Sequence, residues 1–133
     1  MQHNLLSEYL QDVRLAVQSL MNVYVEYYEE EVLTSYRVNV RIRIRFAQGH
    51  LLALHEAIAL QAGRLVWLSY RYHFQNQQNA LIFRYDDTPL FPKLPTFPHH
   101  NHKHIPQSVI AASKPPIIDA ITEAKSKGAP NEY

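Results

Sequence analysis

A histidine-rich segment near the C-terminal third of the chain carries the side chains best suited to chemistry. Four histidines fall within six residues there: His99, His100, His102 and His104. Histidine titrates near neutral pH and can therefore take up and release protons during a reaction. A ribonuclease that works without metal needs a base, an acid and a cation that stabilises the negative charge developing on the phosphoryl group. Candidates for these catalytic roles are Arg84, Tyr85, His99, His100 and His104.

The same histidines have a second interpretation as metal ligands. His100, His102 and His104 are spaced by two, so an extended chain places them on one side, where they could bind Zn²⁺ or another divalent transition metal. Asp86 or Asp87 is the nearest carboxylate, and Arg84 lies two residues before Asp86 on the same strand face, where the two could pair. The chain has no cysteine, which excludes thiol catalysis and disulfides. A third interpretation is a surface loop whose histidines cap backbone groups.

Arginines form a second group of candidates. Arg41, Arg43 and Arg45 alternate with apolar residues and therefore project from one face of a strand, roughly 7 Å apart. Three like charges at that spacing suit phosphate groups of RNA or DNA. The alternative is a solvated face whose charges are balanced by Glu56 or by Glu29–Glu31. A later strand could extend this surface, so the candidate nucleic-acid-binding residues are Arg41, Arg43, Arg45, Arg71 and His73.

The aromatic residues of that later strand are open to two interpretations. Tyr70, Tyr72 and Phe74 share one face, and Arg71 and His73 share the other. Tyrosines beside arginines could stack on nucleic-acid bases, or they could belong to a core with their hydroxyl groups at its edge.

Hydrophobic periodicity predicts the elements that position these side chains. Residues 4–20 repeat apolar side chains at steps of three and four, which predicts a helix with Asn4 or Ser7 as its N-cap. Period-two alternation predicts a strand at Val38–Phe46, and a turn at Gln48–Gly49 follows it. Further strands are expected at residues 22–31, 50–60, 65–75 and 80–86. The three acids Glu29–Glu31 are expected in or beside a turn.

The remainder of the chain is expected to be irregular until a short helix. Four prolines between Thr88 and Pro98 predict an extended loop rather than a helix or central strand. Ile117–Ala124 is expected to be helical. The fold class is therefore α+β: an antiparallel meander of about five strands, an N-terminal helix packed on it, a Pro/His-rich loop and a short C-terminal helix. We expect one domain at residues 1–125 and a flexible tail at 126–133.

Composition fits a folded protein, and its net charge says nothing about nucleic-acid binding. Of the 133 residues, 47% are hydrophobic and only 19% are charged, which argues against intrinsic disorder. The net charge is +1, so any basic patch must come from local arrangement. No signal peptide is recognisable, and no apolar run approaches the ~20 residues of a membrane helix.

Three motifs together resemble the TumE family, small proteins described as toxins of bacterial toxin–antitoxin pairs. They are Tyr-x-Tyr-His-Phe-Gln from Tyr70, Leu-Ile-Phe-Arg-Tyr-Asp from Leu81, and Phe-Pro-His-His-x-His-Lys-His from Phe97. The resemblance covers about residues 35–125. Family members commonly continue after Arg-Tyr-Asp with Asn-Ala-Pro-His-His-Pro, whereas here Leu90-Phe91 replaces that histidine pair. A site that depends on this pair would be lost in this chain.

The resemblance implies a helix-turn-helix antitoxin as protein partner and a bacterial cytoplasm as location. Together with the residues, it leads to the hypothesis of a toxin that cleaves RNA without a metal cofactor. Two alternatives stay open: a non-enzymatic protein-binding module of the same fold, and a metal-dependent hydrolase that uses His and Asp ligands. Edge strands could also pair two subunits into a homodimer.

Overall fold

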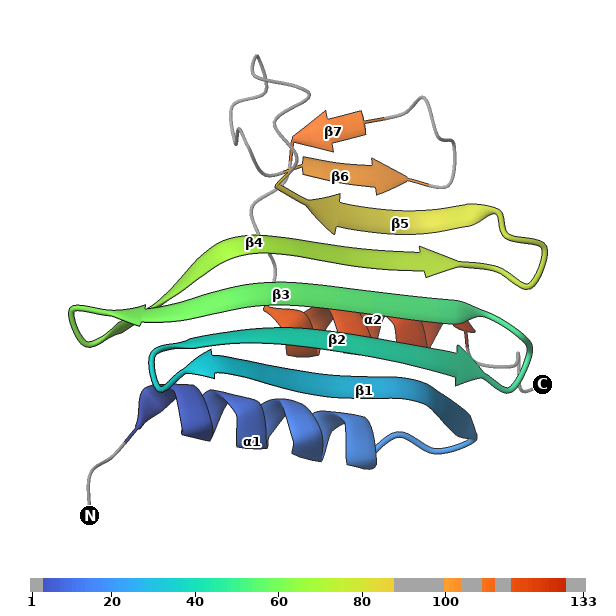
Figure 1. Cartoon of the computed structure of the whole chain (residues 1–133). Coiled ribbons are helices and arrows are strands. Elements are labelled where there is room, and N and C mark those ends of the chain that lie inside the picture. Colours follow the sequence, from blue (N-terminus) through green and yellow to red (C-terminus); the bar gives the residue numbers. More distant parts are fainter. Residues whose placement is uncertain (1–3, 88–99, 104–108, 112–115, 129–133) are drawn as a thin grey trace.

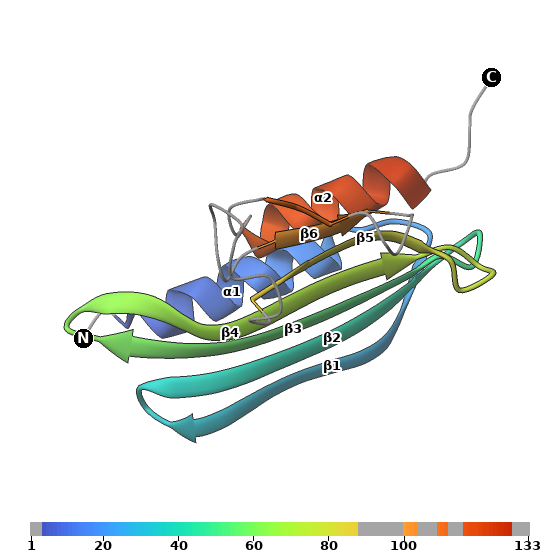
Figure 2. The same ribbon diagram turned by 90° about the horizontal axis from the view of Figure 1, so that it is seen from above.

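The protein is built on an antiparallel sheet whose seven strands lie side by side in chain order. The computed structural model describes residues 4–87, 100–103, 109–111 and 116–128. The sheet order is β1-β2-β3-β4-β5-β6-β7, and two helices pack on one of its faces (Figures 1 and 2). The strands are β1 Val23–Thr34, β2 Arg37–Phe46, β3 Leu51–Gln61, β4 Arg64–Gln75, β5 Leu81–Asp86, β6 His100–Lys103 and β7 Val109–Ala111.

The five long strands confirm the expected meander, and two short strands extend it. β6 lies within the segment that was expected to be a loop, where it pairs with β5. The expected turn at Glu29–Glu31 is wrong, because β1 continues through these residues to Thr34. Their partners on β2 explain the difference: Glu29 pairs in register with Arg41, and the Asn39 amide donates a hydrogen bond of 3.1 Å to Glu31.

Helix α1 (Leu5–Gln18) covers the sheet as its periodicity predicts. The Asn4 side chain caps the helix by accepting a hydrogen bond of 2.9 Å from the Leu6 N–H. The apolar stripe that faces the sheet is buried and consists of Leu6, Leu10, Val13 and Val17. Neither helix of the described chain has the length and apolar character that a membrane crossing requires.

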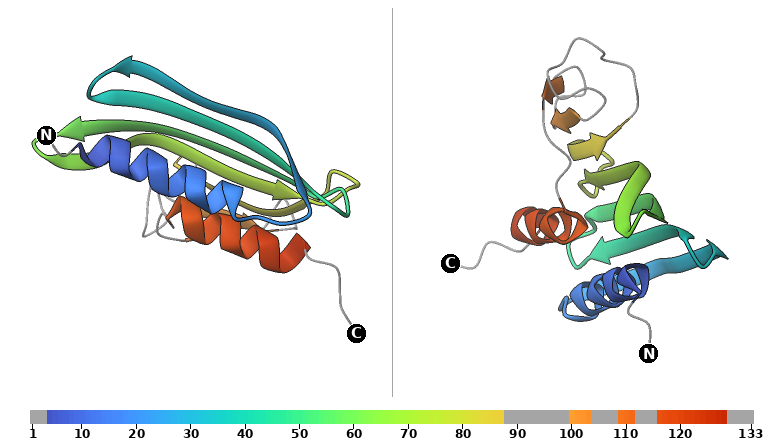
Figure 3. Two further views of the ribbon diagram at one scale, coloured as in Figure 1. Left: turned by 90° about the horizontal axis from the view of Figure 1, so that it is seen from below. Right: turned by 90° about the vertical axis from the view of Figure 1, so that its left-hand side faces the viewer.

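Helix α2 (Ile117–Gly128) lies beside α1 on the same face (Figure 3). It runs four residues past the expected helix end at Ala124. Ile117, Ile121 and Ala124 are buried, and a Cβ built on Gly128 would lie 3.1 Å from the Phe74 ring. Packing against the sheet thus reaches the last helical residue, and residues 129–133 lie outside the described part.

The core lies between the helices and one face of the sheet. Alternate residues of β2 supply it, and Phe46, Phe74 and Phe83 join across the strands with ring centroids 5.7 and 5.3 Å apart. The turn between β2 and β3 falls at Gly49 as expected, with φ at +93° and Gln77 so close that a Cβ would clash at 2.8 Å. Within the described chain, no helix covers the opposite face of the sheet, which we call the open face (Figure 3).

Candidate nucleic-acid interface

Two rows of side chains cross the open face from strand to strand. Residues that pair directly in an antiparallel sheet share a face, so strand register decides which side chains stand together. The first row follows β1 to β5 as Glu29, Arg41, His55, Arg71 and Asp86. The second row follows the same strands as Tyr27, Arg43, Ala53, His73 and Arg84. The predicted arginine surface on β2 is therefore continuous with Arg71, His73 and Arg84.

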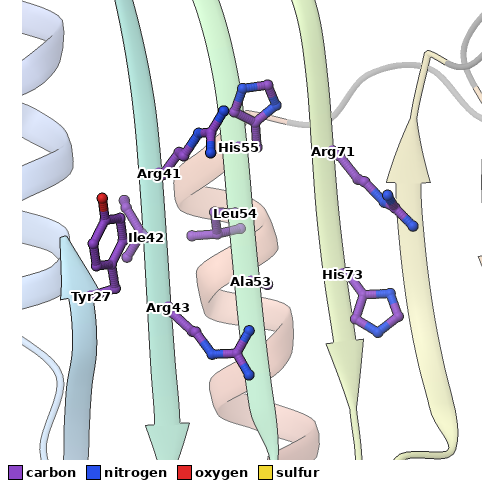
Figure 4. Close-up of a pocket in the computed structure, with 9 residues that line it drawn as sticks. All are labelled: Tyr27, Arg41, Ile42, Arg43, Ala53, Leu54, His55, Arg71 and His73. Carbon is purple, nitrogen blue, oxygen red and sulfur yellow. The ribbon is translucent and has the colours of Figure 1, made fainter. Parts of the chain in front are cut away.

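The middle of these rows encloses a groove of about 540 Å³ (Figure 4). Its walls carry three guanidinium groups and two imidazoles, supplied by Arg41, Arg43, His55, Arg71 and His73. None of the described residues that line it is a carboxylate, so the groove attracts anions. Tyr27 lies at its β1 side. Sequence reasoning found the arginines and His73 but missed His55, whose place between two arginines follows only from the register.

His55 lies between cations on both neighbouring strands. Burial lowers the pKa of this imidazole below its ordinary value, Arg41 and then Arg71 lower the pKa further, and Asp87 opposes them. A histidine with a lowered pKa is neutral at pH 7. It can therefore accept a proton from a bound substrate.

His73 is the second imidazole of the groove. Its Nε2 donates to the Gln75 side-chain oxygen across 2.8 Å, while its buried Nδ1 has no hydrogen-bond partner among the described residues. Burial lowers the pKa of His73, and the cations Arg84 and Arg71 act in the same direction, whereas Gln75 raises it.

Arg84 and Asp86 form the pair that their spacing predicts. The Arg84 Nε lies 3.4 Å from an Asp86 carboxylate oxygen, and Asp86 is only 3% exposed. Burial lowers the pKa of Arg84, as does Arg71, and Asp86 opposes this. Tyr85 is not brought to this site. It points to the helix-covered face, where its hydroxyl donates a hydrogen bond of 2.9 Å to Glu123 on α2.

The backbone pairing of β6 with β5 places part of the histidine segment beside these two rows. On β6, His100 is in register with Asp86 and His102 with Arg84. His99 and His104 lie outside the described residues, so their catalytic roles stay predictions. The metal site of His100, His102, His104 and Asp86 stays a prediction for the same reason. Where the structure describes side chains, no three His, Asp or Glu groups meet closely enough to hold a metal ion.

Arg45, the last residue of the predicted arginine series, is engaged in local contacts. Glu26 accepts from its Nε at 2.9 Å and from the Arg43 Nε at 3.0 Å, so one carboxylate balances two guanidinium groups. Arg45 also donates a hydrogen bond of 3.1 Å to the Gly49 carbonyl. Sequence reasoning offered Glu56 as a counter-ion for this surface. That is wrong, because Glu56 lies on the opposite face and is fully buried.

Glu56 forms a polar cluster inside the core. Its carboxylate accepts hydrogen bonds from the Tyr9 hydroxyl at 2.5 Å, from the Trp67 Nε1 at 2.9 Å and from the Tyr72 hydroxyl. Tyr70 and Tyr72 are 2% and 0% exposed. Of the two interpretations of these tyrosines, the core is therefore confirmed and base stacking is excluded.

The fold and its groove define a small α+β protein with one face covered by helices and one basic open face. A model of the family described as Toxin TumE matches residues 9–126. The chain therefore belongs to the TumE toxin family, which supports a toxin-like role. No curated protein and no solved structure matches the chain.

Proposed function

We propose that this protein is the toxin of a toxin–antitoxin pair and that it binds and cleaves RNA on the open face of its sheet without a metal ion. The observation that carries the proposal is the groove, where two imidazoles lie among three guanidinium groups. Membership of the TumE toxin family supports the toxin role. The family also makes an antitoxin the expected partner. We extend the proposal to a helix-turn-helix antitoxin, a cytoplasmic site of action and a homodimer.

The arginines would bind the RNA backbone. Arg41 and Arg71 flank His55 in one row, and Arg43 stands in the next row, so a phosphate in the groove meets three positive charges from two strands, β2 and β4. The planar guanidinium group of an arginine can bind two oxygens of one phosphate at the same time. Such binding weakens with salt: the logarithm of the binding constant falls with the logarithm of the salt concentration, by about 0.7 per phosphate contact for a single strand.

The reaction that these groups support is attack of a ribose 2′-hydroxyl on the adjacent phosphorus. The hydroxyl proton passes to the neutral imidazole of His55 as the new P–O2′ bond forms. The P–O5′ bond then breaks, and the leaving 5′ oxygen takes a proton from a second, protonated imidazole. The histidines of the 99–104 segment are the candidates for this acid, because burial and two arginines lower the pKa of His73 as well. Arg41 and Arg71 stabilise the negative charge on the phosphoryl oxygens.

The chemistry has a direct test with purified protein, single-stranded RNA labelled at its 5′ end, and EDTA. We expect cleavage that leaves a 2′,3′-cyclic phosphate on one fragment and a 5′-hydroxyl on the other. His55→Gln should abolish cleavage with little loss of RNA affinity, and Arg41→Gln should weaken binding. Arg64→Gln is the matched control, since Arg64 is an exposed arginine at the far end of β4. Circular dichroism should be unchanged in all three variants.

Each alternative function has its own signature in this experiment. Cleavage that EDTA abolishes and Zn²⁺ restores would support the metal-dependent hydrolase. Growth arrest that survives His55→Gln, caused by a folded protein that neither binds nor cleaves RNA, would support the protein-binding module. Absence of both RNA binding and cleavage in the folded protein would contradict the proposal.

A further inference from the structure

Strand β1 forms one outer edge of the sheet. It pairs with β2 along its length, and no other described strand lies on its far side (Figure 1). The pairing is regular from Tyr27 to Val32, between two register shifts. An outer strand presents unpaired N–H and C=O groups that can accept a further strand.

Exposed apolar side chains gather on this same strand. Among the described residues, eleven large hydrophobic side chains are exposed, and five of them belong to β1: Tyr24, Val25, Tyr27, Val32 and Leu33. Val32 is 65% exposed and Tyr24 69%, values typical of side chains without neighbours. Exposed apolar groups that cluster along an unpaired edge favour a protein contact over a purely solvated surface.

The charges of β1 determine which protein would bind. The strand carries Glu26, Glu29, Glu30 and Glu31 and has no Lys or Arg. A second copy would place one acidic strand against another, and like charges opposite each other destabilise a strand pair. Glu26 and Glu30 already pair with arginines of this chain, at 2.7 to 3.0 Å. Glu29 and Glu31 lie on the open face in register with β2.

The two faces of β1 differ in a way that a partner strand must match. Val25 and Val32 pair with core residues of β2 and so lie on the helix-covered side, whereas Glu29 and Glu31 lie on the open side. The strand that pairs with the inner edge of β1 already meets this requirement. Strand β2 alternates Arg or Asn with Val or Ile, and its polar residues bond to the acids of β1.

We propose that the outer edge of β1 binds an extended segment of a partner protein in which Lys or Arg alternates with β-branched apolar residues. Its backbone would pair with Tyr27–Val32, its basic side chains would lie beside Glu29 and Glu31, and its apolar side chains would cover Val32. The antitoxin is one source of such a segment. The inference does not depend on RNA cleavage.

The test uses a short, end-capped peptide of alternating Lys and Val, about as long as the regular stretch of β1. A peptide of alternating Glu and Val, with the opposite charge, is the control. NMR chemical shifts and amide hydrogen exchange are followed on the whole protein. We expect the Lys/Val peptide to protect amides of Tyr27–Val32 and the Glu/Val peptide not to bind. In a Glu29→Lys, Glu31→Lys variant the preference should reverse. Asp12→Lys, on the exposed side of α1, is the charge control.

Three outcomes would overturn the inference. The Lys/Val peptide could protect amides elsewhere, or it could bind the charge-reversed variant as tightly as the original protein. Sedimentation could also show that the protein alone is a dimer and that Val32→Lys separates it. The edge would then be occupied by a second copy rather than by a basic partner segment.

Discussion

Tyr9 of α1 donates a hydrogen bond to Glu56 of β3, and the two residues are 47 positions apart in the chain. The bond fixes the N-terminal helix to the sheet through a polar contact inside an apolar core. Trp67 packs edge-on against Tyr9 at 5.4 Å and donates to the same carboxylate. A buried carboxylate with several donors is costly to replace, because an amide keeps only one acceptor oxygen and leaves at least one of those donors without an acceptor.

We therefore expect Glu56→Gln to lower the free energy of unfolding by about 1.5–3 kcal/mol, the usual range for hydrogen bonds to a charged group. Urea denaturation followed by tryptophan fluorescence measures this change. Glu123→Gln is the matched control: it removes a carboxylate that also accepts from a tyrosine but is partly exposed, so its effect should be smaller. Equal effects of the two substitutions would contradict a special role of the Glu56 cluster.

Stability should also fall in alkaline solution. Burial raises the pKa of Tyr9 and Tyr72 above the ordinary value of 10.0, and Glu56 raises it further. Below pH 10 both hydroxyls are protonated in the folded and the unfolded chain. Above pH 10 only the unfolded chain releases these protons, so the free energy of unfolding decreases by at most about 1.4 kcal/mol per pH unit for each tyrosine.

Unfolding in urea between pH 9 and pH 11 tests this expectation. The decline should be shallower in a Tyr9→Phe, Tyr72→Phe variant, and it should persist in part because burial also raises the pKa of Tyr28 and Tyr70. Tyr24→Phe is the matched control, because Tyr24 is exposed and lies outside the core. A slope that is identical in all three proteins would assign the alkaline effect to other groups.

Removal of Glu26 should strengthen RNA binding. Its carboxylate balances Arg43 and Arg45 on the open face, so Glu26→Gln leaves more positive charge beside the groove. We expect the affinity for single-stranded RNA at low salt to increase by roughly two- to fivefold, about the effect of a surface ion pair. Fluorescence anisotropy over a series of salt concentrations measures it. Asp12→Asn, on the exposed side of α1, is the control; an equal gain there would indicate only a net-charge effect.

The pKa of His55 should depend on the cationic side chains beside it. Its pKa is expected below the ordinary value of 6.5, mainly because it is partly buried and next because of Arg41. Arg41→Ala should raise the pKa towards that value, whereas Arg64→Ala should not. NMR titration of the imidazole ring protons provides the measurement. A pKa at or above 6.5 in the unaltered protein would remove the support for His55 as a base at neutral pH.

The sequence predicts the fold where alternation is unambiguous. In Val38–Phe46, apolar and basic residues alternate strictly, so the strand and the open-face position of Arg41 and Arg43 both follow from the pattern. Strand β3 has apolar residues on both faces around the adjacent pair His55 and Glu56, so its pattern does not reveal which face the histidine takes. Only the pairing of His55 with Arg41 and Arg71 brings it into the groove. Long-range register, rather than local pattern, determines this part of the site.

Two acidic groups show the same limit of local patterns. Consecutive acids are typical of turns, yet Glu29–Glu31 form part of a strand, because polar residues of β2 lie opposite them and pair with them. Glu56 is a single acid within an apolar run, which indicates solvent contact on general grounds. Its burial depends on donors from α1 and β4 that are remote in the sequence.

The chain order of the sheet has a consequence for how the protein folds. Each strand pairs with its neighbour in sequence, so the sheet can form hairpin by hairpin at low loop-closure cost. The core, however, needs α2, which follows all seven strands. Lys127 lies over the Phe83 ring at 5.6 Å, and Gly128 packs on Phe74. A growing chain therefore exposes these rings until α2 has been synthesised, and the finished core appears only at that late step.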